Sequence, residues 1–180
     1  MIHIFDLDNT LVYTDAANRD AYNAALREAG LEPVRSSGRI TRHVVKKAYP
    51  QLSDPQLRQI IARKQALFLP EKTVVNLPLL QYARRQGRDH CLIWSGADPA
   101  RAAALIRCHG LDAYFRDTYF SKKADMAAEF RELLRRFSLK KEELTIYEDT
   151  DSSIEMLRGM NILVVDVKDW PSADGLAQKR

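Results

Sequence analysis

Short apolar runs that alternate with helix-like segments are the feature of this sequence that most constrains its fold. The runs that we assign as strands cover residues 2–6, His90–Trp94, Tyr119-Phe120, Leu144–Tyr147 and Ile162–Val167. Strands that alternate with helices favour a parallel sheet whose two faces are both covered. The sequence therefore predicts an α/β fold built on a parallel sheet.

The segments between the later runs carry the start, stop and spacing signals of helices. We predict helices over residues 78–86, 98–108, 126–137 and 152–158. Gly87 follows the first of these helices, and Asp98-Pro99 begins the second, as is common at helix ends and starts. Met126 and Phe130, with the apolar residues that follow them, recur at helical spacing, so the third helix has one apolar face.

The chain between the first two long strands has a different character. Residues 15–72 favour helices, with breaks at residues 30–38 and 50–55. Ser53-Asp54-Pro55 is a helix start, because serine caps a helix end and proline fits the first turn. We therefore expect two parts, which are a core of residues 1–14 and 76–180 and a helical insertion of residues 15–75.

Polar side chains stand at the ends of three predicted strands. Asp6 and Asp8 close the first strand, Ser95 follows the second, and Glu148-Asp149 follow a later one. Open parallel sheets bind ligands beyond the carboxyl ends of their strands, so we expect these residues to converge. Residues two apart on a strand point the same way, and buried like charges need a compensating cation or dipole. Asp6 and Asp8 therefore indicate a divalent metal, with one carboxylate left to act on a substrate.

The order of these motifs resembles that of the haloacid dehalogenase superfamily of phosphatases. The matching residues are Asp6, Asp8 and Thr10 in the first motif, Ser95 in the second, Lys122-Lys123 in the third and Glu148-Asp149 in the fourth. The resemblance covers nearly the whole chain. It implies a Rossmann-like α/β core and a small α-helical cap, inserted after the first strand, that covers the active site and selects the substrate.

The resemblance also implies roles in the hydrolysis of a phosphate monoester. Asp6 would be the nucleophile that forms an aspartyl-phosphate. Asp8 would protonate the leaving alcohol and later deprotonate the attacking water. Thr10, Ser95 and Lys123 would bind the phosphate group.

Magnesium is the cofactor that the resemblance implies. Its ligands would be Asp6, the backbone carbonyl of Asp8, Asp149, and Glu148 either directly or through water. Ser153 stands where many relatives have a second aspartate. Asp151 is either an alternative ligand or a cap of the next helix. A Glu-Asp pair followed by Ser or Thr resembles the beta-phosphoglucomutase-like branch of the family.

Two choices stay open. The first concerns Lys122 and Lys123, which are adjacent. In the family, the phosphate-binding lysine commonly precedes a Pro-Asp pair. We prefer Lys123, because the sequence Lys123-Ala124-Asp125 has the same spacing between lysine and aspartate. The leading function is a magnesium-dependent phosphatase for a small phosphorylated metabolite. The alternatives are a sugar phosphomutase that uses the same residues, and a catalytically silent module that binds a phosphorylated ligand or regulates a partner.

Composition narrows the class of protein further. Of 180 residues, 46% are hydrophobic and 29% are charged, as in a globular domain. No apolar run approaches the roughly 20 residues that span a membrane, and Asp6 interrupts any secretory signal. Cys91 and Cys108 favour two buried thiols over a disulfide, so we expect a cytoplasmic protein. A net charge of +4 favours an anionic ligand, and the scattered Lys and Arg residues argue against nucleic acid.

Overall fold

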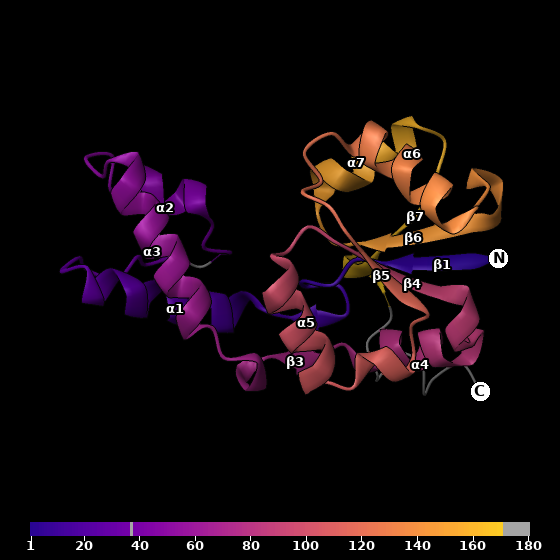
Figure 1. The fold of residues 1–180 in the computed structure, drawn as a ribbon, viewed down its shortest axis with the longest axis horizontal. Coiled ribbons are helices and arrows are strands. Elements are labelled where there is room, and N and C mark those ends of the chain that lie inside the picture. Colours follow the sequence, from indigo (N-terminus) through magenta and orange to yellow (C-terminus); the bar gives the residue numbers. More distant parts are fainter. Residues whose placement is uncertain (37, 171–180) are drawn as a thin grey trace. The chain divides into compact units, whose positions relative to one another are not determined.

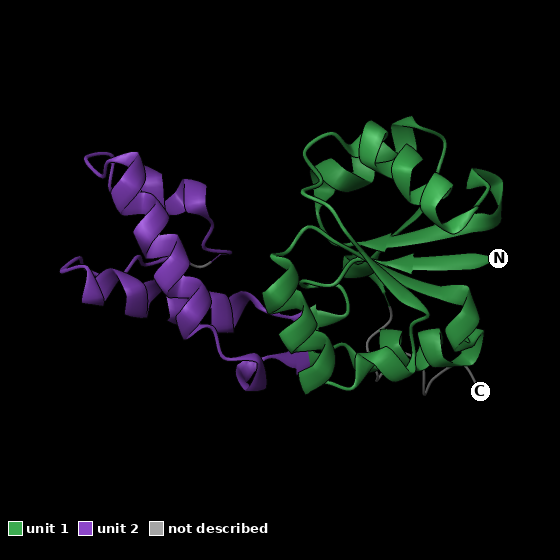
Figure 2. Ribbon diagram, viewed as in Figure 1, with its two compact units in different colours: residues 1–12, 75–180 green, residues 13–74 purple. Residues whose placement is uncertain are grey.

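Two compact units make up the protein (Figure 2). The computed structural model describes residues 1–36 and 38–170. Its internal contacts divide the chain into one unit of Met1–Val12 with Val75–Arg180 and a second unit of Tyr13–Val74. The predicted core also included residues 171–180, which lie outside the described residues.

A five-stranded sheet forms the centre of the first unit (Figure 1). All its strands run parallel, in the order β5-β4-β1-β6-β7. They are β1 (Ile2–Phe5), β4 (Cys91–Ser95), β5 (Asp117–Phe120), β6 (Leu144–Glu148) and β7 (Leu163–Asp166). Ile4 pairs with Leu92 on one side and with Ile146 on the other, so β1 is the middle strand. Strands that are buried on both faces need apolar residues throughout, which explains the nearly continuous apolar runs.

Helices cover both faces of this sheet. The first face carries α4 (Leu77–Gln86) and α5 (Pro99–Cys108), and the second carries α6 (Met126–Phe137) and α7 (Asp151–Gly159). Trp94, Phe130 and Leu133 belong to the apolar core beneath α6 and α7. Gly87 ends α4 with a φ of 87°, a conformation that costs glycine little. The predicted α/β fold, with a helical insertion after the first strand, is confirmed.

The register of the central strands brings their carboxyl ends to one edge of the sheet. Phe5 pairs with Ile93 on β4 and with Tyr147 on β6. The amide of Asp6 donates to the carbonyl of Tyr147 at 2.9 Å, which continues the pairing by one residue. The residues that end or follow these strands are therefore neighbours, and they include Asp6, Ser95 and Glu148.

The second unit is a small bundle of helices. They are α1 (Asp15–Glu28), α2 (Arg42–Ala48) and α3 (Asp54–Leu67). Ser53 begins α3 with a capping box, in which its hydroxyl accepts from the amide of Gln56 and the Gln56 side chain accepts from the amide of Ser53. The three helices share a buried apolar core that includes Tyr22, Leu26, Val45, Leu57 and Ile60.

Short elements complete the described chain. β2 (Val12–Tyr13) pairs with β3 (Val74–Val75) in a two-stranded sheet. Single turns of 3-10 helix cover Pro70–Lys72, Arg88–His90, Leu111–Ala113, Lys141–Glu143 and Val167–Asp169. Within residues 1–36 and 38–170, every helix is too short or too polar to cross a membrane.

The two cysteines are both free, but only one is buried. Cys91 is the first residue of β4, and burial raises the pKa of its thiol to about 11, so the thiol stays protonated. Cys108 is exposed. The expectation of two buried thiols is therefore wrong for Cys108, because α5 ends at this residue, beyond the buried positions Ala102 and Leu105.

Candidate active site

The loop after β1 carries two of the predicted site residues. Asp6 and Asp8 are buried, with 7% and 6% of their surface exposed. Asn9 turns the chain with a φ of 61°, and its amide donates to the carbonyl of Val12 at 2.7 Å. Asparagine accepts this left-handed conformation better than most residues. The tight turn keeps both aspartates at the carboxyl edge of the sheet.

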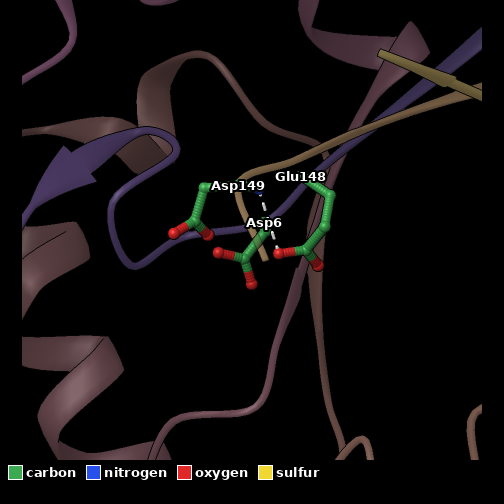
Figure 3. Close-up of side chains that lie close together, drawn as sticks. All are labelled: Asp6, Glu148 and Asp149. Atoms are coloured by element: carbon green, nitrogen blue, oxygen red, sulfur yellow. Dashed lines mark hydrogen bonds between the residues drawn. The ribbon is translucent and has the colours of Figure 1, made fainter. Parts of the chain in front are cut away.

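Three carboxylates meet at this edge (Figure 3). Oxygen atoms of Asp6, Glu148 and Asp149 lie within 4.8 Å of one another. Glu148 is 2% exposed, and its Oε1 accepts from the amides of Asp149 and Thr150, both at 3.1 Å. These two hydrogen bonds fix the glutamate at the end of β6. Clustered carboxylate oxygens are the ligands that hard divalent cations prefer.

The ammonium group of Lys123 lies between two of these carboxylates. Its Nζ donates to Asp6 Oδ1 and to Glu148 Oε2, each at 2.7 Å. Burial lowers the pKa of Lys123, but Asp6 and Glu148 outweigh burial and raise it above its usual value. The lysine therefore stays charged. Lys122 is exposed, so the structure brings Lys123 and not its neighbour to the carboxylates.

The charges at this edge favour a bound cation. With all three carboxylates ionised, the cluster and the ammonium group of Lys123 would together carry a charge of minus two. Burial raises the pKa of Asp6 to about 7, with Lys123 opposing the shift and Glu148 adding to it. A buried cluster of this charge is stabilised by a divalent cation. The donor atoms and the charge of the cluster therefore fit magnesium.

The pattern of motifs along the chain is also found in a known family. A family model of haloacid dehalogenase-like hydrolases matches residues 2–161, which include every site residue described above. The chain belongs to the haloacid dehalogenase-like hydrolases. No curated protein matches the chain.

Solved structures share the fold of this hydrolase at low sequence identity. A haloacid dehalogenase-like family protein from Streptococcus pneumoniae is 17% identical, with 98% of this chain and 89% of that chain covered and a TM-score of 0.75. A predicted phosphoglycolate phosphatase from Haemophilus somnus is 15% identical, with coverages of 92% and 84% and a TM-score of 0.74. A candidate beta-phosphoglucomutase from Thermotoga maritima is 18% identical, with coverages of 99% and 91% and a TM-score of 0.67.

Arg101 is a residue of the hydrolase site that the sequence did not single out. Its Nη1 and Nη2 donate to the two carboxylate oxygens of Asp8 at 2.8 and 2.6 Å. Arg101 lies in the first turn of α5, where a positive charge is unfavourable to the helix dipole. That unfavourable position is the one local signal of a partner elsewhere in the chain.

The two predicted hydroxyl groups are present at the site of the hydrolase and are fully buried. Thr10 Oγ1 donates to Asp149 Oδ1 at 3.5 Å, and Ser95 Oγ accepts from the amide of Ala97 at 3.1 Å. Both side chains therefore lie at the edge of the sheet where the carboxylates meet.

Asp151 is not brought to the carboxylate cluster. Its side chain is exposed and forms an ion pair with Lys168, which follows β7. The cluster within the described residues consists of Asp6, Glu148 and Asp149. The alternative in which Asp151 is a metal ligand therefore has no support from the side-chain positions of the hydrolase.

Proposed function

We propose that this hydrolase is a magnesium-dependent phosphatase that acts on a small phosphorylated metabolite through an aspartyl-phosphate intermediate. The observation that carries the proposal is the position of Asp6. Its carboxylate is buried, accepts a hydrogen bond from Lys123 and lies close to two further carboxylates. A carboxylate in that position combines a nucleophile with the positive charge that an incoming phosphate needs.

Asp6 is the nucleophile in this proposal. Its carboxylate oxygen attacks phosphorus, and the bond between phosphorus and the leaving alcohol oxygen breaks. The ammonium of Lys123, 2.7 Å from Asp6, offsets the repulsion between the anionic nucleophile and the anionic phosphate. The hydroxyl groups of Thr10 and Ser95 donate to phosphoryl oxygens.

Asp8 handles the protons in this proposal. It donates a proton to the leaving alcohol and then accepts one from the water that hydrolyses the aspartyl-phosphate. Asp8 follows Asp6 by two residues on one tight loop, so a group bound to Asp6 lies within reach of Asp8. Arg101 donates hydrogen bonds to both oxygens of Asp8 and so holds this side chain as a carboxylate. For the acid step, substrate binding must displace Arg101 from at least one of these oxygens, and Asp8 must take up a proton from solvent.

Asp6, Glu148 and Asp149 would hold the magnesium ion, with the backbone carbonyl of Asp8 as a further ligand. When bound, magnesium supplies positive charge that neutralises the phosphoryl oxygens. The net charge of the carboxylate cluster and its hard oxygen donors support this assignment.

The size class of the substrate is inferred from the relatives. One structural neighbour is a predicted phosphoglycolate phosphatase, a name that describes a small phosphorylated acid as substrate. A small phosphorylated metabolite is accordingly the partner that we propose.

A phosphate-release assay tests the proposal. Sugar phosphates, nucleotides and small organic phosphates would be incubated with the protein, with magnesium and with EDTA. We expect release that EDTA abolishes, that magnesium restores and that Asp6→Asn removes. Asp89→Asn, an exposed aspartate in a 3-10 helix, is the matched control and should keep full activity. Activity that resists EDTA would contradict the metal, and an active Asp6→Asn variant would contradict the nucleophile.

A sugar phosphomutase is the second candidate. It is favoured by the Glu148-Asp149 pair at the end of β6 and by the candidate beta-phosphoglucomutase among the structural neighbours. A mutase transfers the phosphoryl group from Asp6 back to sugar, whereas a phosphatase transfers it to water. Conversion of glucose 1-phosphate to glucose 6-phosphate with a bisphosphate activator, without net phosphate release, would identify the mutase.

A further inference from the structure

The backbone at Lys123 has an unusual conformation. Its φ is 50°, which lies in the left-handed region that residues other than Gly and Asn rarely adopt. Such residues persist where the surrounding structure holds them, and they concentrate at functional sites. The loop from Lys122 to Asp125 therefore needs a group that keeps Lys123 in this conformation.

The carboxylate of Glu129 is that group. Its Oε2 accepts from the amide of Lys123 at 2.7 Å, and its Oε1 accepts from the amides of Ala124 and Asp125 at 3.1 and 3.4 Å. One side chain on α6 thus binds three successive amides of the loop. Burial raises the pKa of Glu129, but hydrogen bonds from the Ser121 hydroxyl and from these amides outweigh burial and lower it.

The Glu129 contacts connect to the rest of the site. Ser121, which bonds Glu129, accepts a hydrogen bond from Trp94 Nε1 at 2.8 Å. Nζ of Lys123 lies 5.3 Å from the centre of the Trp94 ring. Carboxylates therefore hold Lys123 at both ends, with Glu129 at its amide and Asp6 and Glu148 at its ammonium group.

We propose that Glu129 is a positioning residue that directs the Lys123 side chain, rather than that of Lys122, toward Asp6. The proposal rests on the proposed function for its effect on turnover. Lys122 and Lys123 are chemically identical, so the backbone conformation decides which of them faces the site. Glu129 fixes that conformation through the three amides, and it is not one of the carboxylates of the Asp6, Glu148 and Asp149 cluster.

The first test is the turnover of Glu129→Ala and Glu129→Gln. A shift of the lysine by about 1 Å lowers turnover by roughly 10²-fold, so we expect a loss of that order in kcat for Glu129→Ala. Glu129→Gln keeps one acceptor oxygen and should lose less. Glu132→Ala is the matched control, since Glu132 is on the same helix and pairs with exposed Arg135. Wild-type kcat in Glu129→Ala would overturn the proposal.

A double-mutant cycle separates positioning from a general effect on α6. If Glu129 acts through Lys123, then Glu129→Ala should cost no further activity in a Lys123→Ala background. An equal loss in both backgrounds would overturn the proposal, because a damaged helix would lower the activity with or without the lysine.

Hydrogen exchange tests the same contacts without an activity assay. In the wild type the amides of Lys123, Ala124 and Asp125 should exchange slowly, and Glu129→Ala should accelerate all three by about tenfold or more. Glu132→Ala should leave them unchanged. Slow exchange in Glu129→Ala would overturn the positioning role. If the wild type releases no phosphate from any substrate but these amides depend on Glu129, then the proposed function fails and the positioning role stands.

Discussion

Asp6 and Asp8 are two residues apart and equally buried, yet each is paired with a cation in a different way. Asp6 shares the single ammonium of Lys123 with Glu148, at 2.7 Å from each carboxylate. The two oxygens of Asp8 accept hydrogen bonds from both terminal nitrogens of the Arg101 guanidinium. Lysine is a compact point charge, whereas arginine matches a carboxylate with two parallel hydrogen bonds.

The difference teaches how one loop supports two kinds of chemistry. The carboxylates around Lys123 outnumber its ammonium group. This part of the site therefore favours the binding of a further cation, which would in turn favour the binding of a phosphate. The Asp8–Arg101 pair is neutral, and its geometry is fixed at both oxygens. In the proposed mechanism, the first environment holds a nucleophile beside a metal, and the second holds a carboxylate that must leave Arg101 and take up a proton before it acts as an acid.

The largest expected effect is that of Asp6→Asn. Loss of a nucleophile lowers turnover by about 10⁴-fold or more, because no aspartyl-phosphate can form. Phosphate release under saturating magnesium measures this loss, and circular dichroism checks that the fold is retained. Detection of a phosphorylated protein in Asp6→Asn would show that the nucleophile lies elsewhere.

Asp8→Asn should have the next largest effect, and the effect should depend on the leaving group. General acid catalysis contributes about 10²- to 10⁴-fold, and a poor leaving group needs it most. We expect a large loss of kcat with an alkyl phosphate and a much smaller loss with p-nitrophenyl phosphate, whose phenolate leaves without a proton. Equal losses with both substrates would argue against an acid role for Asp8.

Removal of each cation tests the comparison through stability. Breaking a buried ion pair costs about 3 kcal/mol, so both Lys123→Met and Arg101→Met should lower the free energy of unfolding in urea without magnesium. Added magnesium should restore the free energy of unfolding of Lys123→Met, because a divalent cation offsets the negative charge that remains when the lysine is removed. Magnesium should not restore the free energy of unfolding of Arg101→Met. Recovery of both variants would mean that the two pairs are not independent.

The raised pKa of Asp6 predicts how stability depends on pH. Its pKa is about 7 in the folded protein against 3.8 as the ordinary value. The folded state therefore binds more protons than the unfolded state between these values, so its stability falls as pH rises from about 4 to about 7. Without metal, Asp6→Asn should become more stable relative to wild type over this range. A stability difference that is constant with pH would contradict the shift.

The smallest expected effect is that of Lys122→Ala. Lys122 is exposed, and surface substitutions usually change stability by less than about 0.5 kcal/mol. Its kcat and KM should stay within about twofold of wild type, whereas Lys123→Ala should lose activity strongly. A large loss in Lys122→Ala would mean that the two lysines exchange places during turnover.

The fold was readable from the sequence because its signals are local. Apolar runs such as Leu144–Tyr147 mark strands, and Ser53 and Gly87 mark the start of one helix and the end of another. The rule that ligands bind at the carboxyl ends of parallel strands then predicts that Asp6 and Glu148 meet. These inferences need no knowledge of distant side-chain contacts.

Arg101 and Glu129 were not readable in the same way. Arg101 bonds Asp8 across 93 positions of the chain, and nothing in the sequence near either residue specifies that distance. Glu129 is close in sequence to the loop that it contacts. Its proposed positioning role depends on the backbone angle of Lys123, and the sequence around Lys123 does not distinguish this residue from an ordinary surface lysine. The exposure of Cys108 was likewise not readable, because the predicted end of the helix at residue 108 does not specify that the last buried position of α5 is Leu105.

The strand order also governs when the site can form during synthesis. β1 lies between β4 and β6, so the earliest of these strands to be made obtains both of its neighbours only after Glu148 has been added. Until then, Asp6 lacks Lys123 and the β6 carboxylates. A nascent chain that ends before β6 therefore has neither the complete sheet nor the carboxylate cluster. Ligand binding can report on the completion of folding, because the first-made and late-made parts of the chain must meet before any ligand is held.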